Sequence, residues 1–263
     1  MKRLFILVAV LLIVGCLCFA LYFTYAPDKN EDPPDYSDIV RLPEPTSIPV
    51  REPQQTEPAP ASSPEPAPYL SPIDFEALWD RNPDIIAWMD IPNTDISYPV
   101  VQRKGDDAFY LKHNSDGDYS TVGALFSESA YNTDDFSDLI TALYGHRTRG
   151  VTMLGRLQSL YSEENAMQDY GLVRVFLPDK ELDYEVFAAM PYSSVHIPDT
   201  YGVNDLRGKR LFQYHISDTH SLDGRVVNER FPQTEDPVLI LSTCLTGNDD
   251  RRFLVFARQI SAS

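Results

Sequence analysis

The sequence predicts a mainly β domain, either a closed barrel or a sandwich decorated with helices, that follows one membrane-spanning helix. Three observations support this prediction. Many short strand-like segments and few helical ones occupy residues 73–263. An uncharged apolar run fills residues 4–25, and a proline-rich acidic segment separates it from the strands. We therefore divide the chain into a cytoplasmic N-terminus with its anchor (1–26), a spacer (27–72) and a folded domain (73–263).

The composition excludes several classes of protein. The 263 residues contain 22 Lys and Arg against 39 Asp and Glu, so the formal net charge is −17. A nucleic-acid partner is excluded, because phosphate binding requires a basic surface. Hydrophobic residues make up 43% of the chain, which is enough for a core and excludes a wholly disordered protein. Three cysteines are too few for a disulfide framework or a cysteine zinc cluster.

The run from Leu4 to Tyr25 has the length and composition of a transmembrane helix. Its 22 uncharged residues span about 33 Å, enough to cross a bilayer core. Lys2 and Arg3 precede it, so the positive-inside rule predicts a single-pass protein of the cell membrane with a cytoplasmic N-terminus and an extracellular domain. The run lacks the short apolar core and cleavage site of a secretory signal. The alternative is a lipoprotein signal with a lipidated Cys16, which also tethers the chain to the outer face.

The predicted spacer, residues 27–72, holds 13 of the 21 prolines and few large apolar side chains. Nine acidic residues against three basic ones give it a net charge of −6. Such a composition does not bury enough surface to offset the entropy of folding, and prolines favour extended conformations. We expect a stalk that holds the domain away from the membrane. A proline-rich ligand for a partner protein is the alternative.

Strand-like segments dominate residues 73–263. Two short helices are predicted within Asp74–Met89, the second opened by Pro83, and another helix within Met153–Tyr161. The predicted strands are Ile96–Val101, Gly123–Phe126, Leu139–Tyr144, Leu172–Leu177, Leu182–Met190, Val238–Thr243 and Phe253–Ile260. In one of them, strict alternation predicts a shared face made of Leu182, Tyr184, Val186 and Ala188.

Cys244 is the single cysteine of the folded domain, and only two residues separate it from the apolar run 238–241. An unpaired thiol at the end of a strand is either a nucleophile or a small core residue. A nucleophile needs a base nearby, and His146 also ends an apolar strand, after Gly145, which is expected to permit a sharp turn. Arg252 opens the last strand, where it is placed either to donate hydrogen bonds to an oxyanion or to form an ordinary ion pair with Asp249 or Asp250.

These segments together resemble the sortases, the cysteine transpeptidases of Gram-positive cell surfaces. The family's Thr-Leu-x-Thr-Cys strand end is matched by Ile240–Cys244, with Ile in the first Thr position. Its general acid/base histidine is matched by Tyr144-Gly145-His146, and its arginine by Arg252. The resemblance is closest to class B, on five further segments: Asn82–Trp88, Ile91–Gln102, Tyr144–Arg147, Met153–Leu157 and the long insert Tyr192–Asp236.

The resemblance implies a closed sortase-type barrel with N-terminal helices and a helical insert before the cysteine strand. Cys244 is then the nucleophile, His146 the general acid/base and Arg252 the group that stabilises the oxyanion, while Ser242 and Thr243 contact the substrate. The implied partners are secreted proteins with a C-terminal sorting signal, cleaved after Thr, and an amine acceptor on a peptidoglycan precursor or a pilin. One amide is exchanged for another, so no cofactor is expected.

Several alternatives stay open at this point. A non-catalytic binding module could keep the same barrel, and a cysteine peptidase could let water resolve the thioester. The acidic loops at Asp116–Asp118 and Asp134–Asp135 lack EF-hand spacing, so solvated loops are favoured over calcium sites and no metal site is predicted. No lid segment precedes the barrel, which disfavours a pilin polymerase of class C. The sequence does not indicate which sorting motif the protein recognises.

Overall fold

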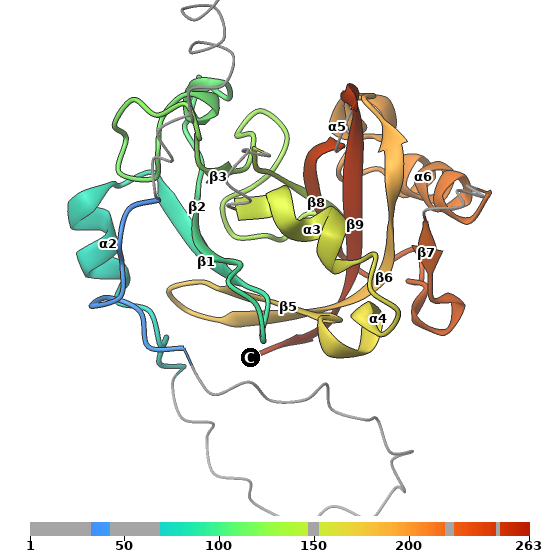
Figure 1. Cartoon of the computed structure of the whole chain (residues 1–263), viewed down its shortest axis with the longest axis horizontal. Coiled ribbons are helices and arrows are strands. Elements are labelled where there is room, and N and C mark those ends of the chain that lie inside the picture. The colour runs from blue at the N-terminus through green and yellow to red at the C-terminus, as the bar shows by residue number, and fades with distance from the viewer. Residues whose placement is uncertain (1–32, 43–68, 147–152, 219–223, 246–247) are drawn as a thin grey trace, which may run out of the picture. The chain divides into compact units, whose positions relative to one another are not determined.

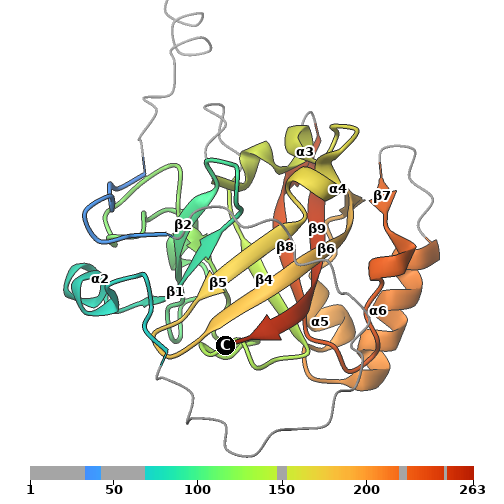
Figure 2. The ribbon, with the colours of Figure 1, turned by 90° about the horizontal axis from the view of Figure 1, so that it is seen from below.

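Eight strands of the structure, a computed structural model, form a closed β-barrel (Figures 1 and 2). Their order is β5-β1-β2-β3-β4-β8-β9-β6, and β6 pairs with β5 to close the ring, while the short β7 pairs with β6. The strands are β1 (Ile85–Asp90), β2 (Ser97–Val101), β3 (Leu125–Phe126), β4 (Ile140–Tyr144), β5 (Leu172–Phe176), β6 (Glu181–Ser193), β7 (Arg225–Val226), β8 (Val238–Leu245) and β9 (Asn248–Ala262). The predicted closed barrel is confirmed.

The structure describes residues 33–42, 69–146, 153–218, 224–245 and 248–263, which all belong to the unit Pro33–Ser263. The predicted anchor and most of the predicted spacer lie outside these ranges. Among the helices within them, none combines the length and the apolar character that crossing a membrane requires.

Short helices connect the strands. They are α2 (Phe75–Arg81), η1 (Phe109–Leu111), η2 (Met153–Arg156), α3 (Leu157–Leu160), α4 (Ala166–Asp169), α5 (Ile197–Tyr201), α6 (Leu206–Asp218) and η3 (Asn228–Arg230). The helix predicted within Met153–Tyr161 is therefore present as η2 followed by α3. The helical insert predicted before the cysteine strand is also present, because α5 and α6 lie between β6 and β8.

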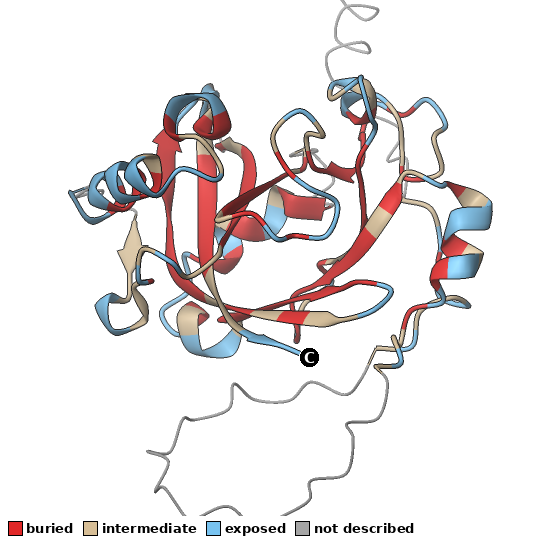
Figure 3. Cartoon of the chain, turned by 180° about the vertical axis from the view of Figure 1, so that it is seen from behind, coloured by how far each residue is buried: buried red, intermediate tan, exposed pale blue. Residues whose placement is uncertain are grey.

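The strands of the barrel wall carry buried side chains on both of their faces. Leu241 of β8 and Val255 of β9 belong to the cluster that fills the barrel interior. Their neighbours Ile240 and Phe256 belong to a second cluster outside the wall, which Phe212 of α6 covers. Figure 3 shows the result, with buried strands throughout the barrel and helices that are exposed on their outer sides. The side chains of β9 therefore alternate between the two clusters.

The second helix predicted within Asp74–Met89 is wrong. The first helix, α2, ends at Arg81, and Ile85–Asp90 form strand β1 instead. β1 pairs with β2 on one edge and with β5 on the other, so both of its edges are hydrogen-bonded. A short apolar run fits a buried strand as well as a helix, and here pairing with distant strands decides the outcome.

The strict alternation predicted along β6 also fails at one position. A register shift between Val186 and Ala188 opposite β9 marks a β-bulge. Because of the extra residue, Ala189 and not Ala188 joins Val186 in the barrel interior, whereas Ala188 joins the outer cluster.

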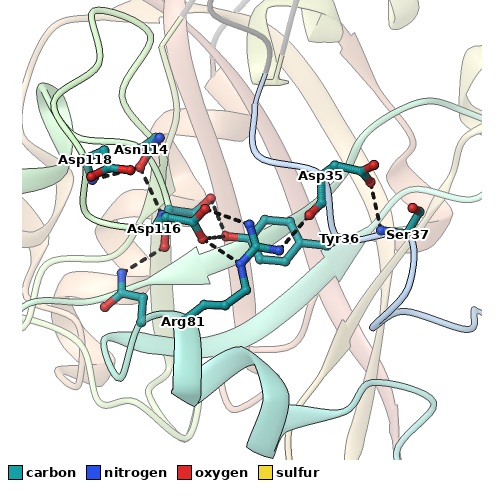
Figure 4. A network of polar contacts seen from close by, with 9 residues as sticks. Asp35, Tyr36, Ser37, Arg81, Asn114, Asp116 and Asp118 are labelled. Atoms are coloured by element: carbon teal, nitrogen blue, oxygen red, sulfur yellow. Dashed lines mark hydrogen bonds and ion pairs between the residues drawn. The ribbon is translucent and has the colours of Figure 1, made fainter.

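Residues 33–42, part of the predicted spacer, pack against the barrel domain (Figure 4). Tyr36 is only 5% exposed, and its ring lies 3.9 Å below the Arg81 guanidinium and 5.6 Å from Trp88, edge to face. Its hydroxyl donates to Asp116 (2.7 Å) and accepts from Ser115 (3.0 Å). Asp116, from an acidic loop considered above for calcium, also forms an ion pair with Arg81 (2.6 Å). The folded unit thus includes residues that precede the predicted boundary at 73.

Replacing Tyr36 with Ala will lower the free energy of unfolding by about 3 kcal/mol, because a buried aromatic ring and its packing are lost. Tyr36→Phe keeps the ring and loses only the hydroxyl bonds, for an expected loss of about 1 kcal/mol. Urea unfolding of the full chain, followed by tryptophan fluorescence, measures both. Tyr214 of α6 is 61% exposed, so Tyr214→Ala serves as the control. A Tyr36→Ala protein as stable as this control would show that the docked segment adds nothing to stability.

Candidate active site

The three predicted catalytic residues line one pocket of about 360 Å³. The pocket lies on the outer side of the barrel wall. Along each strand, the side chains that line the pocket alternate with side chains that point into the barrel interior. Residues 193–197, from the last residue of β6 to the first residue of α5, form a further wall of the pocket. The lining residues carried by strands are Phe126 of β3, Ala142 and Tyr144 of β4, Ser193 of β6, Ile240, Ser242, Thr243 and Cys244 of β8, and Arg252 and Leu254 of β9.

Strand register brings His146 level with Cys244. β4 and β8 are parallel, with Tyr144 opposite Ser242, and the Gly145 amide donates to the Ser242 carbonyl (3.1 Å). His146 follows Tyr144 by two residues, as Cys244 follows Ser242, so both occupy equivalent positions on neighbouring segments. Adjacent strands lie about 4.8 Å apart. The imidazole and the thiol therefore share one end of the pocket.

Arg252 reaches the thiol from the other neighbouring strand. β8 and β9 are antiparallel, and Cys244 lies directly opposite Arg252. The Arg252 Nη1 atom is 3.8 Å from the half-buried Cys244 Sγ. The adjacent Arg251 is exposed and lines a different pocket. Cys244 thus has a guanidinium donor on one side and an imidazole on the other, an arrangement suited to an anion that forms next to the sulfur.

The surroundings of His146 keep its ring neutral. Its Nε2 atom lies 3.0 Å from the carbonyl oxygen of Leu111, and because a carbonyl only accepts, Nε2 carries a proton and Nδ1 is left for proton exchange. Burial lowers the pKa of His146, the bond to Leu111 raises it by a smaller amount, and the charge of Arg252 lowers it further. A pKa below the usual value leaves the imidazole mostly neutral at pH 7, where it can act as a base.

Two glycines make room for this arrangement. Gly123 has a φ of +69°, and a Cβ there would lie 2.7 Å from the Tyr110 carbonyl oxygen and 2.9 Å from His146 Cδ2. Gly145 was expected to allow a sharp turn, but its φ lies outside the positive region and a Cβ there would instead meet Leu154 at 2.8 Å. The need for glycine at 145 is therefore one of space, because Leu154 packs against it.

The two predicted substrate-contact residues differ in their placement. Ser242 lies on the outer face of β8 between Ile240 and Cys244, and it lines the pocket floor. Thr243 alternates toward the opposite face and is 2% exposed, although part of it reaches the pocket. Its Oγ1 atom is buried and has no hydrogen-bond partner among the described residues. The ion pair considered for Arg252 is with Asp249 or Asp250, and the side chain of Asp249 lies outside the described part of the chain.

The sequence analysis did not single out Glu128 and His196, which line this pocket. Glu128 lines the pocket and accepts a 2.7 Å hydrogen bond from Nε2 of His196. Glu128 lies two positions after the pocket residue Phe126. Because side chains two positions apart along a strand point to the same face, this spacing could have predicted that Glu128 lines the pocket. No comparable signal exists for His196, which lies in an irregular connection between β6 and α5.

Comparison with known proteins finds similarity in sequence and in fold. No family model matches the sequence. The chain is 27% identical to sortase B of Listeria monocytogenes over 187 residues, which cover 67% of this chain and 69% of that protein. It is similar to the structure of a mutant form of Clostridium perfringens sortase B, with a TM-score of 0.62, 24% identity and coverage of 72% of this chain and 87% of that chain. A Streptococcus pyogenes class B sortase involved in pilus biogenesis has a TM-score of 0.60 at 24% identity, with coverage of 71% and 97%.

The barrel carries a cysteine, a histidine and an arginine that line one pocket at its wall. The chain therefore resembles the sortase B proteins in sequence, and the solved sortase B structures in fold. The resemblance seen in the sequence motifs is thereby confirmed.

Proposed function

We propose that this chain is a sortase-type transpeptidase of class B character in which Cys244 is the nucleophile. The observation that carries the proposal is the position of Cys244, half-buried in a pocket with Arg252 Nη1 at 3.8 Å and His146 level with it on the neighbouring segment. A purely structural thiol would be packed among apolar side chains without these two neighbours.

The proposed first step forms a thioester. A secreted protein's sorting signal lies in the pocket with the carbonyl carbon of its Thr next to Sγ of Cys244. Neutral His146 takes the thiol proton as the sulfur attacks that carbon. Arg252 donates a hydrogen bond to the oxyanion of the tetrahedral intermediate. The amide C–N bond breaks, His146 returns the proton to the leaving amine, and Thr remains bound to Cys244 as a thioester.

The proposed second step forms a new amide. An amine of a peptidoglycan precursor or of a pilin attacks the thioester carbon, and His146 takes the amine proton. The C–S bond then breaks and the sulfur recovers a proton from His146. Every proton and electron pair is accounted for by the enzyme and its two substrates. We further propose that residues 4–25 anchor the domain outside the cell membrane, where secreted substrates and cell-wall amines meet.

Ligation of peptides tests the proposed function. The full chain in detergent is mixed with Asn-Pro-x-Thr and Leu-Pro-x-Thr peptides and with an amine acceptor, and the products are weighed by mass spectrometry. We expect cleavage after Thr and a new amide to the acceptor. Release of free acid alone, even with the amine in excess, would identify a hydrolase instead. No reaction together with a Cys244 that resists alkylation would favour the non-catalytic binding module.

Gly123→Ala should lower kcat/KM for ligation by a factor of about 10 to 100, because the new Cβ displaces His146. Gly117→Ala is the matched control, since Gly117 also has a positive φ, +87°, but has open space around its Cα. Both variants carry similar backbone strain. Equal loss of kcat/KM in the two variants would mean that strain, and not the position of His146, causes the effect.

A further inference from the structure

The carbonyl group that binds His146 belongs to the short helix η1. The carbonyl oxygen of Leu111, the last residue of η1, lies 3.0 Å from His146 Nε2 and sets which ring nitrogen carries the proton. η1 is a 3₁₀-helix of only three residues, and a helix of this length has little stability of its own. The direction of the Leu111 carbonyl therefore depends on the contacts that hold η1 from outside.

Tyr110 is the residue of η1 that is packed into the protein. Its side chain is 2% exposed and belongs to the same apolar cluster as Tyr36 and Trp88. Its carbonyl oxygen accepts a hydrogen bond from the amide of Ala124 (3.0 Å). Because Tyr110 directly precedes Leu111, contacts that fix its side chain and its main chain also limit the movement of the Leu111 carbonyl.

Two side chains from the connection between α2 and β1 hold the Tyr110 hydroxyl. The hydroxyl donates to Asp84 Oδ2 (2.8 Å) and accepts from Asn82 Nδ2 (2.8 Å). Asn82 is itself buried, and its Oδ1 accepts from the amide of Asp84 (3.0 Å), so the two partners also fix each other. Burial raises the pKa of Tyr110, so the hydroxyl stays protonated at neutral pH and remains a donor.

The docked segment 33–42 supports the same contacts. Asn82 Nδ2 also donates to the carbonyl oxygen of Ser115 (2.8 Å), and the Ser115 hydroxyl is hydrogen-bonded to Tyr36 (3.0 Å). A continuous set of hydrogen bonds thus connects Tyr36, on the docked segment, to Tyr110 on η1. Asn82 lies at its centre, with two acceptors for its amide group.

We propose that Tyr110 is a positioning residue that, held by Asn82 and Asp84, keeps the Leu111 carbonyl against His146 Nε2. The imidazole then carries its proton on Nε2 and leaves Nδ1 for proton exchange during catalysis. This rests on the proposed function, because it concerns the base of that reaction. Tyr110 does not itself line the pocket, so it acts on His146 through η1 and not on the substrate.

Kinetics of Tyr110→Phe in the full chain provide the first test, because this variant keeps the ring and removes the hydroxyl. We expect kcat for ligation to fall by a factor of about 10 and KM to stay within about twofold, since the imidazole is misplaced and the pocket lining is unchanged. Tyr161→Phe is the matched control. Tyr161 is 1% exposed and donates to the Tyr170 carbonyl (2.8 Å), but it packs in the barrel interior. Its kcat should stay within about twofold of the wild-type value.

Nitrogen NMR of the full chain labelled with ¹⁵N-histidine provides a readout that a general loss of packing does not change. The His146 signals are assigned by their absence in His146→Gln. We expect a protonated Nε2 and an unprotonated Nδ1 in the wild-type protein. In Tyr110→Phe the two nitrogen shifts should move toward each other, because the second tautomer becomes populated. Tyr161→Phe should keep the wild-type shifts.

A second variant covers the case in which Tyr110→Phe does not fold. Asp84→Ala removes the acceptor of the Tyr110 hydroxyl from a side chain that is 28% exposed, and it should produce the same fall in kcat and the same change in shifts. Wild-type nitrogen shifts in a folded variant, or an equal loss of kcat in Tyr161→Phe, would overturn the positioning role. The NMR readout needs no substrate. Failure of the wild-type protein to form an acyl-enzyme would therefore overturn the proposed function separately.

Discussion

Replacing Cys244 with Ala will abolish ligation, reducing the rate by a factor of about 10⁴ or more, because no other group in the pocket forms the acyl-enzyme. Cys244 is the single cysteine among the described residues, and the chain's other two lie at positions 16 and 18 of the predicted anchor. The measurement is the rate of amide formation between a sorting peptide and an amine. The folded state should persist, since Ala fills a half-buried strand position without clash.

The control for Cys244→Ala is its Tm, which should stay within a few degrees of the wild-type value, since the loss of one partly buried sulfur costs about 1 kcal/mol. Ligation that survives in a folded Cys244→Ala protein would contradict the assignment of the nucleophile. A large fall in Tm without a change in ligation would instead point to a structural thiol.

Arg252→Ala will lower kcat by a factor of about 100 to 1,000 with a much smaller change in KM, because the guanidinium acts on charge that develops only in the transition state. The 3.8 Å between Arg252 Nη1 and Cys244 Sγ places this donor beside the atom that attacks. Michaelis kinetics over a range of peptide concentrations separate kcat from KM.

The adjacent arginine supplies the matched control for this prediction. Arg251 carries the same charge one residue earlier, but it is exposed and does not line the pocket. Arg251→Ala should therefore keep kcat within about threefold of the wild-type value. A greater loss in Arg251→Ala than in Arg252→Ala would reverse the assignment of the oxyanion donor.

The sequence pattern singled out Cys244, His146 and Arg252 because each flanks an apolar segment, and the structure places all three in one pocket. Neighbouring strand ends in a barrel meet, so a local pattern places these residues near each other without knowledge of the whole topology. The register then adds what the pattern lacks, namely that Cys244 lies opposite Arg252 and level with His146.

Features that depend on contacts between distant segments could not be predicted in this way. Ile85–Asp90 forms a strand because β2 and β5 pair with it, and its short apolar run alone does not distinguish strand from helix. Tyr36 docks onto Ser115 across 79 positions of sequence, from a segment whose composition indicates a free stalk. His196 contacts Glu128 because the connection between β6 and α5 lines the pocket, and this irregular segment has no periodicity from which its position could be predicted.

The intact mass of the protein after mixing with a sorting peptide tests the central claim most directly. The full chain is quenched in acid within seconds, without an amine acceptor. We predict a mass increase equal to the peptide fragment that ends in Thr, located on Cys244 by fragmentation and removed by hydroxylamine, which cleaves thioesters. A mass increase on another residue, or peptide cleavage with no covalent species even in rapid-quench samples, would contradict catalysis through Cys244.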